Sequence, residues 1–379
     1  MAGEWCECPL GELTDNFDGI RVPVREADRR TGLYPYYGAS GVLDHVDSYL
    51  FDGDYLLIAE DGENLRTRNT PVAFLARGKF WVNNHAHIVR GNDKADTRFL
   101  MYALSAMDIS GYLTGSTMPK LTQGNMNRIP LLTPPLPEQR AIAHILGTLD
   151  DKIELNRRMN ETLEAMARAL FKSWFVDFDL VRANAEGRDS GLPKPLADLF
   201  PDSFKDSELG EIPKGWAVAS IGEVVGVIDY LHSKKPDRQK EGLPLLQLSN
   251  IRDDGLVDMQ DTHFIEEAEY RMWVSRMEAS PGDCVITNVG RVGAVAQMPV
   301  AQKAALGRNM TGLRCKASFS FPTFLIECLL SQAMRDEIIL RMDTGTILDA
   351  LNVRNIPKLR FACSPDTVLQ RFEELARPL

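Results

Sequence analysis

Two histidines in the pattern His85-Ala86-His87 are the side chains of this sequence that most resemble metal ligands. Residues two apart on a β-strand project from the same face, where two imidazoles can share one metal ion. A third ligand is not evident at a useful spacing, because Cys6 and Cys8 lie far away in the sequence. The favoured interpretation is a polar cluster that contacts a nucleic acid or stabilises a loop, and no metal or cofactor is expected in this chain.

Other residues of catalytic type lack the partners that catalysis requires. The acidic pairs at 60–61 and 253–254 have no lysine or metal ligand at the spacing of a nuclease centre, so solvated turns are favoured. The glycine-rich run 290–293 lacks the spacing of a nucleotide-binding loop, and is either a hairpin turn or a turn that brings Arg291 to a phosphate. The methyltransferase motif Asn/Asp-Pro-Pro-Tyr/Phe is absent. The sequence therefore predicts a chain without a catalytic site of its own.

The length and composition are typical of a protein with two domains. A chain of 379 residues exceeds one ordinary core and suits two domains of roughly 100–200 residues with connections. The acidic N-terminal segment does not resemble a secretion signal, and no apolar run approaches the ~20 residues that cross a bilayer. Six cysteines without a CxxC pair indicate reduced thiols. We therefore expect a cytoplasmic protein that does not contact a membrane.

The net charge of −10 argues against DNA binding, which normally requires a basic surface. Net charge averages over the whole surface, however, whereas binding depends on local patches, and the runs 21–30 and 234–240 are basic on balance. Arginine and lysine suit guanine edges and phosphates, and asparagine suits adenine. The candidate DNA-contacting residues are Arg29, Arg30, Tyr36, Tyr37, Asn83, Asn84, His85 and Lys120 in the first half, and Lys234, Lys235, Arg238, Asn288, Arg291, Arg308, Asn309 and Arg354 in the second.

Four short segments recur in the same order in the two halves of the chain. The matching segments are 5–13 and 216–224, 53–58 and 282–286, 83–89 and 308–313, and 125–130 and 352–357. Such self-similarity predicts two copies of one domain, at residues 1–134 and 216–359. Because the sequence between the matches differs almost completely, the two copies suggest two readers of two different targets.

Each copy contains short apolar runs broken by glycine, asparagine and aspartate, which predict β-strands joined by turns. The expected strands are 55–58, 72–75 and 80–82 in the first copy, and 285–287 and 294–296 in the second. One helix is expected to follow in each copy, at 97–106 and at 322–340. The sequence thus predicts an α+β fold with two similar mixed α/β domains.

A long helix is predicted between the two copies, from Pro137 to about Asp179, where the sequence has one glycine and no internal proline. Apolar residues follow alternating steps of four and three, which is the seam of a coiled coil with two asparagines at its middle. The seam consists of Ile142, Leu146, Leu149, Ile153, Asn156, Asn160, Leu163, Ala167, Leu170 and Trp174. An ordinary amphipathic core helix is the alternative, but a length of roughly 60 Å, at 1.5 Å per residue, favours a spacer.

Three segments resemble those of a known family. Pro-Leu-Pro-Glu-Gln-Arg-Ala-Ile-Ala at 135–143 leads into the helix, Leu-Phe-Lys-Ser-Trp-Phe-Val-Asp-Phe at 170–178 ends it, and Ser-Glu-Leu-Gly-Glu-Ile-Pro-Lys-Gly-Trp at 207–216 opens the second copy. Together with Tyr-Tyr-Gly-Ala-Ser-Gly at 36–41 and Asn-Asn-His-Ala-His at 83–87, they resemble the specificity subunit of type I restriction–modification enzymes over nearly the whole chain.

The resemblance implies a subunit that reads DNA for partners that carry out the chemistry. Each recognition domain would read one half of a split double-stranded DNA target, and the helices after the domains would pair in an antiparallel coiled coil that docks two methyltransferase subunits. Those subunits use S-adenosylmethionine to methylate adenine at N6, and a motor–nuclease subunit adds cleavage that depends on ATP and magnesium. Two other functions stay open: a free-standing nuclease, and a scaffold that has lost DNA recognition.

The remaining segments complete the expected organisation. The spacer helix is assigned to 135–182, a linker to 183–215, and the start of a second, truncated spacer helix to 360–379. Because the two helices would pair along their length, we expect part of the seam to lack an intramolecular partner. An exposed apolar stripe is an association surface, so we expect self-association, recruitment of a helix from a separate polypeptide, or poor assembly with the second methyltransferase subunit.

Overall fold

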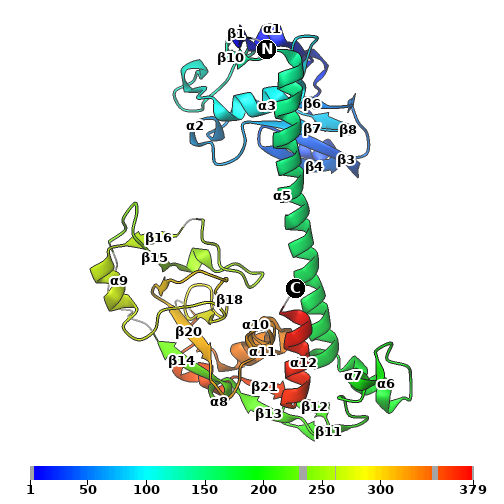
Figure 1. Ribbon diagram of the computed structural model, residues 1–379, viewed down its shortest axis with the longest axis vertical. Helices are drawn as coiled ribbons and strands as arrows, with labels where there is room; N and C mark the ends of the chain where they lie inside the picture. Colours follow the sequence, from blue (N-terminus) through cyan, green and yellow to red (C-terminus); the bar gives the residue numbers. More distant parts are fainter. Residues whose placement is uncertain (1–3, 230–236, 261, 344–348, 378–379) are drawn as a thin grey trace. The chain divides into compact units, whose positions relative to one another are not determined.

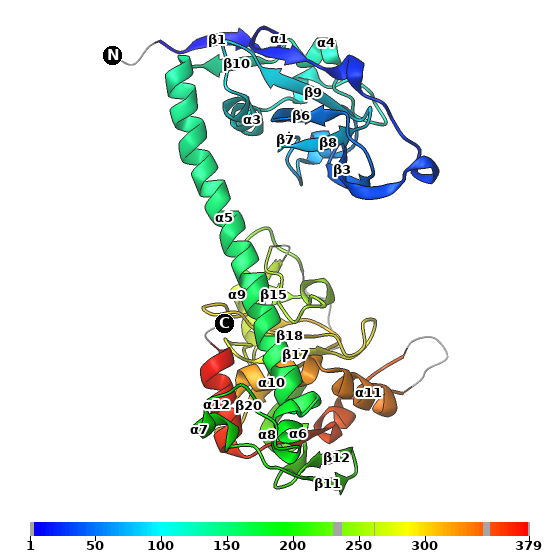
Figure 2. The same cartoon turned by 90° about the vertical axis from the view of Figure 1, so that its right-hand side faces the viewer.

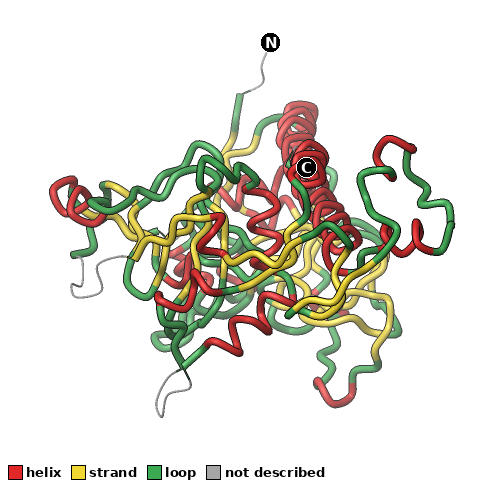
Figure 3. The backbone as a smooth tube through the Cα atoms, turned by 90° about the horizontal axis from the view of Figure 1, so that it is seen from below, coloured by secondary structure: helices red, strands yellow, loops and turns green. Residues whose placement is uncertain are grey.

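The computed structural model describes residues 4–229, 237–260, 262–343 and 349–377. The chain forms two compact units, Met1–Arg157 (unit 1) and Arg158–Leu379 (unit 2), and helix α5 (Leu136–Phe171) begins in the first and ends in the second (Figure 1). Outside α5 the elements are short, and loops form much of each unit (Figure 3). No helix of the described ranges is long and apolar enough to cross a membrane.

Unit 1 is built on a four-stranded antiparallel sheet with the order β2-β9-β6-β7. Its strands are β2 (Thr14–Asn16), β9 (Ala86–Gly91), β6 (Tyr55–Ala59) and β7 (Ala73–Ala76). Residues 56–59 of β6 are all buried, because this central strand is covered on both faces. Helix α3 (Thr97–Ala106) packs on β6 and β7 (Figure 2), and the Asp96 side chain caps it by accepting from two backbone amides.

A second sheet of unit 1 has the order β4-β3-β8-β5. Its strands are β3 (Thr31–Gly38), β4 (Gly41–Val46), β5 (Phe51–Asp52) and β8 (Lys79–Val82). Strands β3 and β8 are parallel, with Tyr36 opposite Trp81 and Tyr37 opposite Val82. This pairing brings the tyrosines next to Asn83, whose amide donates to the carbonyl of Tyr37 (N–O 3.0 Å). The other elements of unit 1 are β1 (Cys6–Pro9), β10 (Pro130–Thr133), α1 (Leu10–Leu13), α2 (Asn64–Thr67), α4 (Gln123–Met126) and the 3-10 turns Asp18–Ile20, Glu26–Asp28 and Ser110–Tyr112.

Unit 2 repeats this arrangement with an antiparallel sheet of order β14-β20-β17-β18 and a smaller sheet of order β16-β15-β19. The strands are β14 (Val225–Asp229), β20 (Met310–Cys315), β17 (Cys284–Thr287), β18 (Val295–Gln297), β16 (His263–Ile265), β15 (Leu243–Leu246) and β19 (Ala305–Leu306). Strands β15 and β19 are parallel, as β3 and β8 are. The other elements are α6 (Asp179–Ala185), α7 (Lys194–Ala197), β11 (Phe204–Ser207), β12 (Gly210–Pro213), β13 (Ala217–Ser220), α8 (Ile221–Val224), α9 (Glu267–Trp273), α10 (Pro322–Leu330), α11 (Gln332–Arg341), β21 (Arg360–Cys363), α12 (Asp366–Ala376) and the 3-10 turns Leu248–Asn250 and Val353–Lys358.

The two units share one topology. In each large sheet the first strand follows a one-turn helix, α1 or α8, and the pair β1–β10 of unit 1 corresponds to β13–β21 of unit 2. Helix α3 packs on β6 and β7 as α10 packs on β17 and β18. The predicted mixed α/β fold class is confirmed. The domain boundaries at 134 and 216 stay predictions.

Two helices differ from their predicted extents. The α-helical part of α5 ends at Phe171 and continues as a π-helical turn at Lys172–Val176, before Phe178 adopts a left-handed conformation with φ 53°. The single helix expected at 322–340 is two helices, α10 and α11. Ser331 between them is extended, and its side chain caps α11 by accepting a backbone amide. The apolar pattern continues through this break because both helices pack on the same core.

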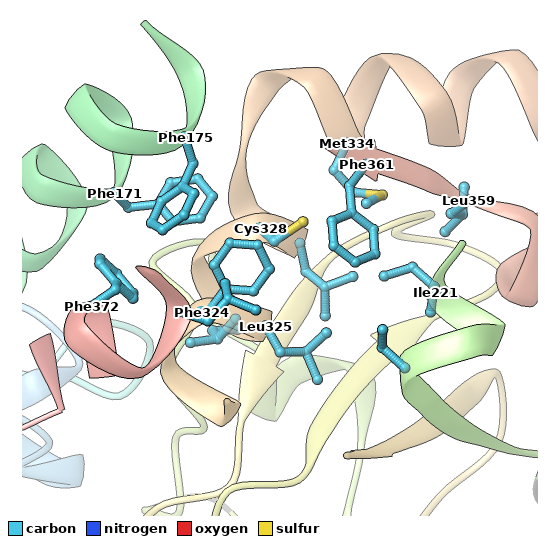
Figure 4. Close-up of a cluster of buried hydrophobic side chains, with 14 of the residues drawn as sticks. Phe171, Phe175, Ile221, Phe324, Leu325, Cys328, Met334, Leu359, Phe361 and Phe372 are labelled. Carbon is cyan, nitrogen blue, oxygen red and sulfur yellow. The ribbon is translucent and has the colours of Figure 1, made fainter. Parts of the chain in front are cut away.

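The core of unit 2 is an aromatic cluster formed by the end of α5, α10 and α12 (Figure 4). Phe372 of α12 is fully buried, and its ring centroid lies 6.0 Å from that of Phe171, 5.2 Å from Phe175 and 6.4 Å from Phe324. Trp174, the last position of the predicted seam, is buried in the same cluster. The end of α5 is therefore part of the core of unit 2.

Candidate nucleic-acid interface

His87 lies buried on β9 with a hydrogen-bond acceptor at each ring nitrogen. Nδ1 is 2.6 Å from Asp18 Oδ2, and Nε2 is 2.8 Å from the carbonyl oxygen of Leu121. The imidazole thus bridges a carboxylate and a backbone carbonyl oxygen. Burial alone would raise the pKa of Asp18, but hydrogen bonds from His87 and from the amide of Ile88 hold that pKa below its ordinary value.

Glu60, which directly follows β6, links this pair to two cations. Its carboxylate oxygens lie 2.8 Å from Arg21 Nη1 and 3.2 Å from Lys120 Nζ. Burial alone would raise the pKa of Glu60, but the hydrogen bond from Arg21, the charge of His87 and the hydrogen bond from Lys120 lower it. The network therefore joins four segments that are distant in the sequence at one end of the large sheet of unit 1. These segments carry Asp18 and Arg21, Glu60, His87, and Lys120.

The equivalent position of unit 2 carries an amide instead of a carboxylate. Asn288 follows β17 as Glu60 follows β6, and in both cases the backbone carbonyl accepts the amide of a leucine. The buried Asn288 side chain accepts from the hydroxyl of Thr311 (2.9 Å) and donates to the carbonyl of Leu351 (3.1 Å). Thr311 has the place on β20 that His87 has on β9, since each lies opposite an isoleucine of the neighbouring strand. The two copies thus share a scaffold here but differ in charge.

Several candidate side chains of unit 1 stabilise the fold in this structure. Tyr36 is buried, and the amide of Val24 donates to its hydroxyl (3.0 Å). The Arg29 guanidinium lies over the Tyr36 ring, 4.5 Å from its centroid, and pairs with Asp44 (3.4 Å). Asn83 is buried, and its side-chain oxygen accepts the amide two residues further on.

The other candidates of unit 1 reach solvent. Arg30 and Asn84 are exposed. His85 is about half exposed, and its Nδ1 lies 2.8 Å from Asp61 Oδ2. Lys120 is about half exposed while it pairs with the charged network. Tyr37 is half-buried against two phenylalanine rings. The parallel pairing of β3 and β8 gathers the 36–37 and 83–85 segments, although nearly fifty residues of sequence separate them.

In unit 2, the predicted Lys234 and Lys235 lie outside the described residues. Arg291 donates to the carbonyl oxygens of Leu248 and Ile251 and pairs with an aspartate, so the turn at 290–293 is held against the preceding loop. Asn309 has a left-handed backbone with φ 63° directly before β20. The exposed candidates of this unit are Arg238, Arg308 and Arg354.

The sequence analysis missed the charged network as a unit. The expectation of a solvated turn is wrong for Glu60, whose side chain is 14% exposed, because Arg21 and Lys120 approach from other segments. The His-x-His spacing pointed to His87, but its two partners are 69 and 34 residues away in the sequence. No group of three or more histidine, cysteine, aspartate or glutamate side chains that could hold a metal ion occurs in the part of the chain that the structure describes.

Replacing His87 with alanine is expected to destabilise unit 1 by about 2–4 kcal/mol, because it removes one of the donors to the buried Asp18 carboxylate and leaves a buried carbonyl without its donor. Urea unfolding of the wild type and the variant measures the difference. His85→Ala is the matched control from the same motif, and should change stability by less than about 1 kcal/mol because the His85 side chain, which contacts Asp61, is about half exposed. Equal losses in both variants would show that the network of His87 is not buried in solution.

The middle of α5 exposes an apolar stripe. Ile145 is 61% exposed, Leu149 53%, Ile153 59% and Met159 51%. Seam positions nearer the two ends of the helix are half-buried or buried, and the asparagines at its middle are exposed. The half-buried or buried positions are Ile142, Leu146, Leu163, Ala167, Leu170 and Trp174, and the exposed asparagines are Asn156 and Asn160. A contiguous apolar stripe of this kind marks a surface for association.

A family model described as Type I restriction modification DNA specificity domain matches residues 3–165. The chain is 47% identical over 217 residues to the Type I restriction enzyme HindI specificity subunit of Haemophilus influenzae, covering 52% of this chain and 46% of that protein. It is 24% identical over 334 residues to the Type I restriction enzyme MjaIX specificity subunit of Methanocaldococcus jannaschii, covering 86% of this chain and 72% of that protein.

The fold is similar to that of the type I restriction–modification system S subunit from M. genitalium, with a TM-score of 0.61 and 15% identity. That comparison covers 99% of this chain and 89% of the other. A further relative from Haemophilus influenzae is 40% identical over 141 residues, which span 36% of its length. The chain therefore spans from 36% to 72% of the length of these three curated relatives.

Proposed function

Because the chain belongs to the family of type I restriction–modification specificity subunits, we propose that it supplies the DNA sequence specificity of such a system. Each unit reads one half of a split double-stranded DNA target. The chemistry resides in partner subunits, which bring S-adenosylmethionine for adenine methylation, and ATP and magnesium for translocation and cleavage.

The observation that carries the proposal is the repeated sheet with different side chains at equivalent positions. Glu60 and His87 at the end of the first sheet correspond to Asn288 and Thr311 at the end of the second. The common scaffold gives the two surfaces the same geometry. A charged network supports the surface of unit 1, and a neutral network supports the surface of unit 2. Two such surfaces suit two different sequences better than a repeat of one sequence.

The exposed stripe on α5 supports a role in assembly. Apolar side chains at coiled-coil spacing bury themselves against partner helices, and asparagines at the middle of a seam set the register of the pairing. We propose that this stripe, which includes Leu149 and Ile153, packs against helices of two methyltransferase subunits or of a second spacer helix. The motor–nuclease subunit would then join through that complex.

Exchange of residues 216–359 for the equivalent segment of a relative tests the two-reader proposal. The expected result is a methylated motif in which one half-site changes and the other stays the same, because the two sheets are separate bodies of the fold. Methylome sequencing of cells that carry the exchanged chain with its partner subunits measures the motif. A simultaneous change of both halves would contradict independent reading, and an unchanged motif would exclude unit 2 from recognition.

A further inference from the structure

A hollow of about 530 Å³ in unit 1 is lined by Arg98 and by four other basic side chains, none of which the sequence analysis selected. Arg77 follows β7, Arg90 lies on β9, and Arg140 and His144 lie one turn apart near the start of α5. All four are exposed. Elements that are distant in the sequence therefore bring basic side chains together in one hollow, although the net charge of the chain is −10.

Three of the four arginines of this hollow are not neutralised within the described part of the chain, whereas Arg98 pairs with Asp151 (3.2 Å). Arg77 and Arg140 make no hydrogen bond or ion pair there, and Arg90 lies only over the ring of Tyr55, 5.9 Å from its centroid. Asp96 lines the same hollow, but its carboxylate oxygen is engaged as the N-cap of α3. Asp54 is the other acidic residue of the lining, and it is exposed. The hollow therefore has a net positive charge and guanidinium groups available for a ligand.

Unit 2 provides an internal comparison. In the strand register, Arg90 lies opposite Asp15, the second residue of β2. Arg314 lies opposite Gly226, the second residue of β14, so the two arginines have equivalent positions. Arg314 is held in place: its Nε is 2.8 Å from Asp283, and one of its Nη atoms is 2.8 Å from the carbonyl of Glu278. Asp283 is the counterpart of Asp54 in the Gly-Asp pair before the central strand. The equivalent arginine is thus held by internal hydrogen bonds in unit 2, where it is Arg314, and is available to a ligand in unit 1, where it is Arg90.

We propose that the hollow formed by Arg77, Arg90, Arg140 and His144 binds a phosphate of the DNA backbone beside the half-site that unit 1 reads. The proposal rests on the proposed DNA-reading function. Guanidinium groups present planar pairs of donors that match phosphate oxygens. Arg77 also lines a second hollow together with Tyr37, a candidate DNA contact, so the basic hollow adjoins the segment expected to face DNA, although Asp150, Asp151 and Glu154 also line that second hollow. Such a contact positions the duplex but reads no base.

The test uses the complex of the full chain with its methyltransferase subunits. Binding to a target duplex and to a duplex with a scrambled target is titrated by fluorescence anisotropy between 50 and 200 mM salt. In Arg90→Gln/Arg140→Gln, we expect affinity for both duplexes to fall by a similar factor of about ten. We also expect the slope of log affinity against log salt to become shallower by about 1, as the loss of one phosphate contact predicts. The matched control is Arg188→Gln/Lys194→Gln, which removes two surface cations that pair with Glu186 and Asp198 in unit 2.

The outcomes separate this proposal from the proposed function. A wild-type complex that does not distinguish the two duplexes would overturn the proposed function. A discriminating wild type with an unchanged salt slope in the Arg90/Arg140 variant would overturn only the phosphate site. Loss of binding to the target duplex alone would instead assign the arginines to base reading. Loss of the methyltransferase subunits on size-exclusion chromatography, with DNA binding otherwise unchanged, would assign the hollow to a protein partner.

Discussion

Replacing Phe372 with alanine is expected to destabilise unit 2 by about 3–5 kcal/mol, the usual cost of removing a fully buried phenylalanine ring. The ring packs against Phe171, Phe175 and Phe324, which come from two other helices, so few neighbours can move to fill the cavity. Urea unfolding followed by tryptophan fluorescence measures the loss, because the buried Trp174 lies in the same cluster.

The matched control for this variant is Leu340→Ala. Leu340 is 72% exposed, so its truncation should change the free energy of unfolding by less than about 0.5 kcal/mol. A loss below about 1 kcal/mol in Phe372→Ala would mean that α12 does not pack on the end of α5 in solution. In that case the cluster could not be the core of unit 2.

Replacing Leu149 with aspartate is expected to weaken assembly with the methyltransferase subunits by about a hundredfold, which corresponds to about 2.7 kcal/mol. Leu149 is 53% exposed in the chain alone, and a charge at this position would be buried without a partner if a helix packs on the stripe. The stability of the isolated chain should stay within about 0.5 kcal/mol of the wild type, because the substituted side chain faces solvent there. Size-exclusion chromatography with light scattering measures assembly, and urea unfolding measures stability.

Ala165→Asp is the control for the charge itself. Ala165 is also exposed on α5. It lies between the seam positions Leu163 and Ala167 in the sequence, but on the side of the helix opposite the seam. It should leave assembly unchanged. Full assembly and full methylation activity with Leu149→Asp would show that the stripe is not an interface.

Much of the architecture could be predicted because it depends on patterns local to the sequence. The family was identified from three motifs, and the comparisons with known proteins confirm it. The strand at Tyr55–Ala59 follows from a short apolar run after Gly53-Asp54, and the long helix from steps of four and three. The break at Ser331 escaped prediction because one serine can cap a new helix while the apolar residues on both sides still face the same core.

The candidate site could be predicted only in part, because a side chain's role depends on which distant segments surround it. Tyr36, Asn83 and Asn288 have residue types that suit DNA contact, yet the structure buries all three and pairs them internally. Arg77 and Arg140 were not predicted as DNA contacts from the sequence, because each lies apart from the runs of basic residues. The hollow that joins them exists only once β7, β9 and α5 have packed.

The sequence by itself determined the duplication, the strand and helix types and the family, since these depend on spacings within one segment or on order along the chain. The tertiary structure alone decided the charge balance of each local site. Arg90 and Arg314 have the same place in the two sheets, but only Arg314 has a carboxylate within hydrogen-bond distance. Electrostatic interactions act through space over a few ångströms, so the same residue type is a structural pair in one copy and an open donor in the other.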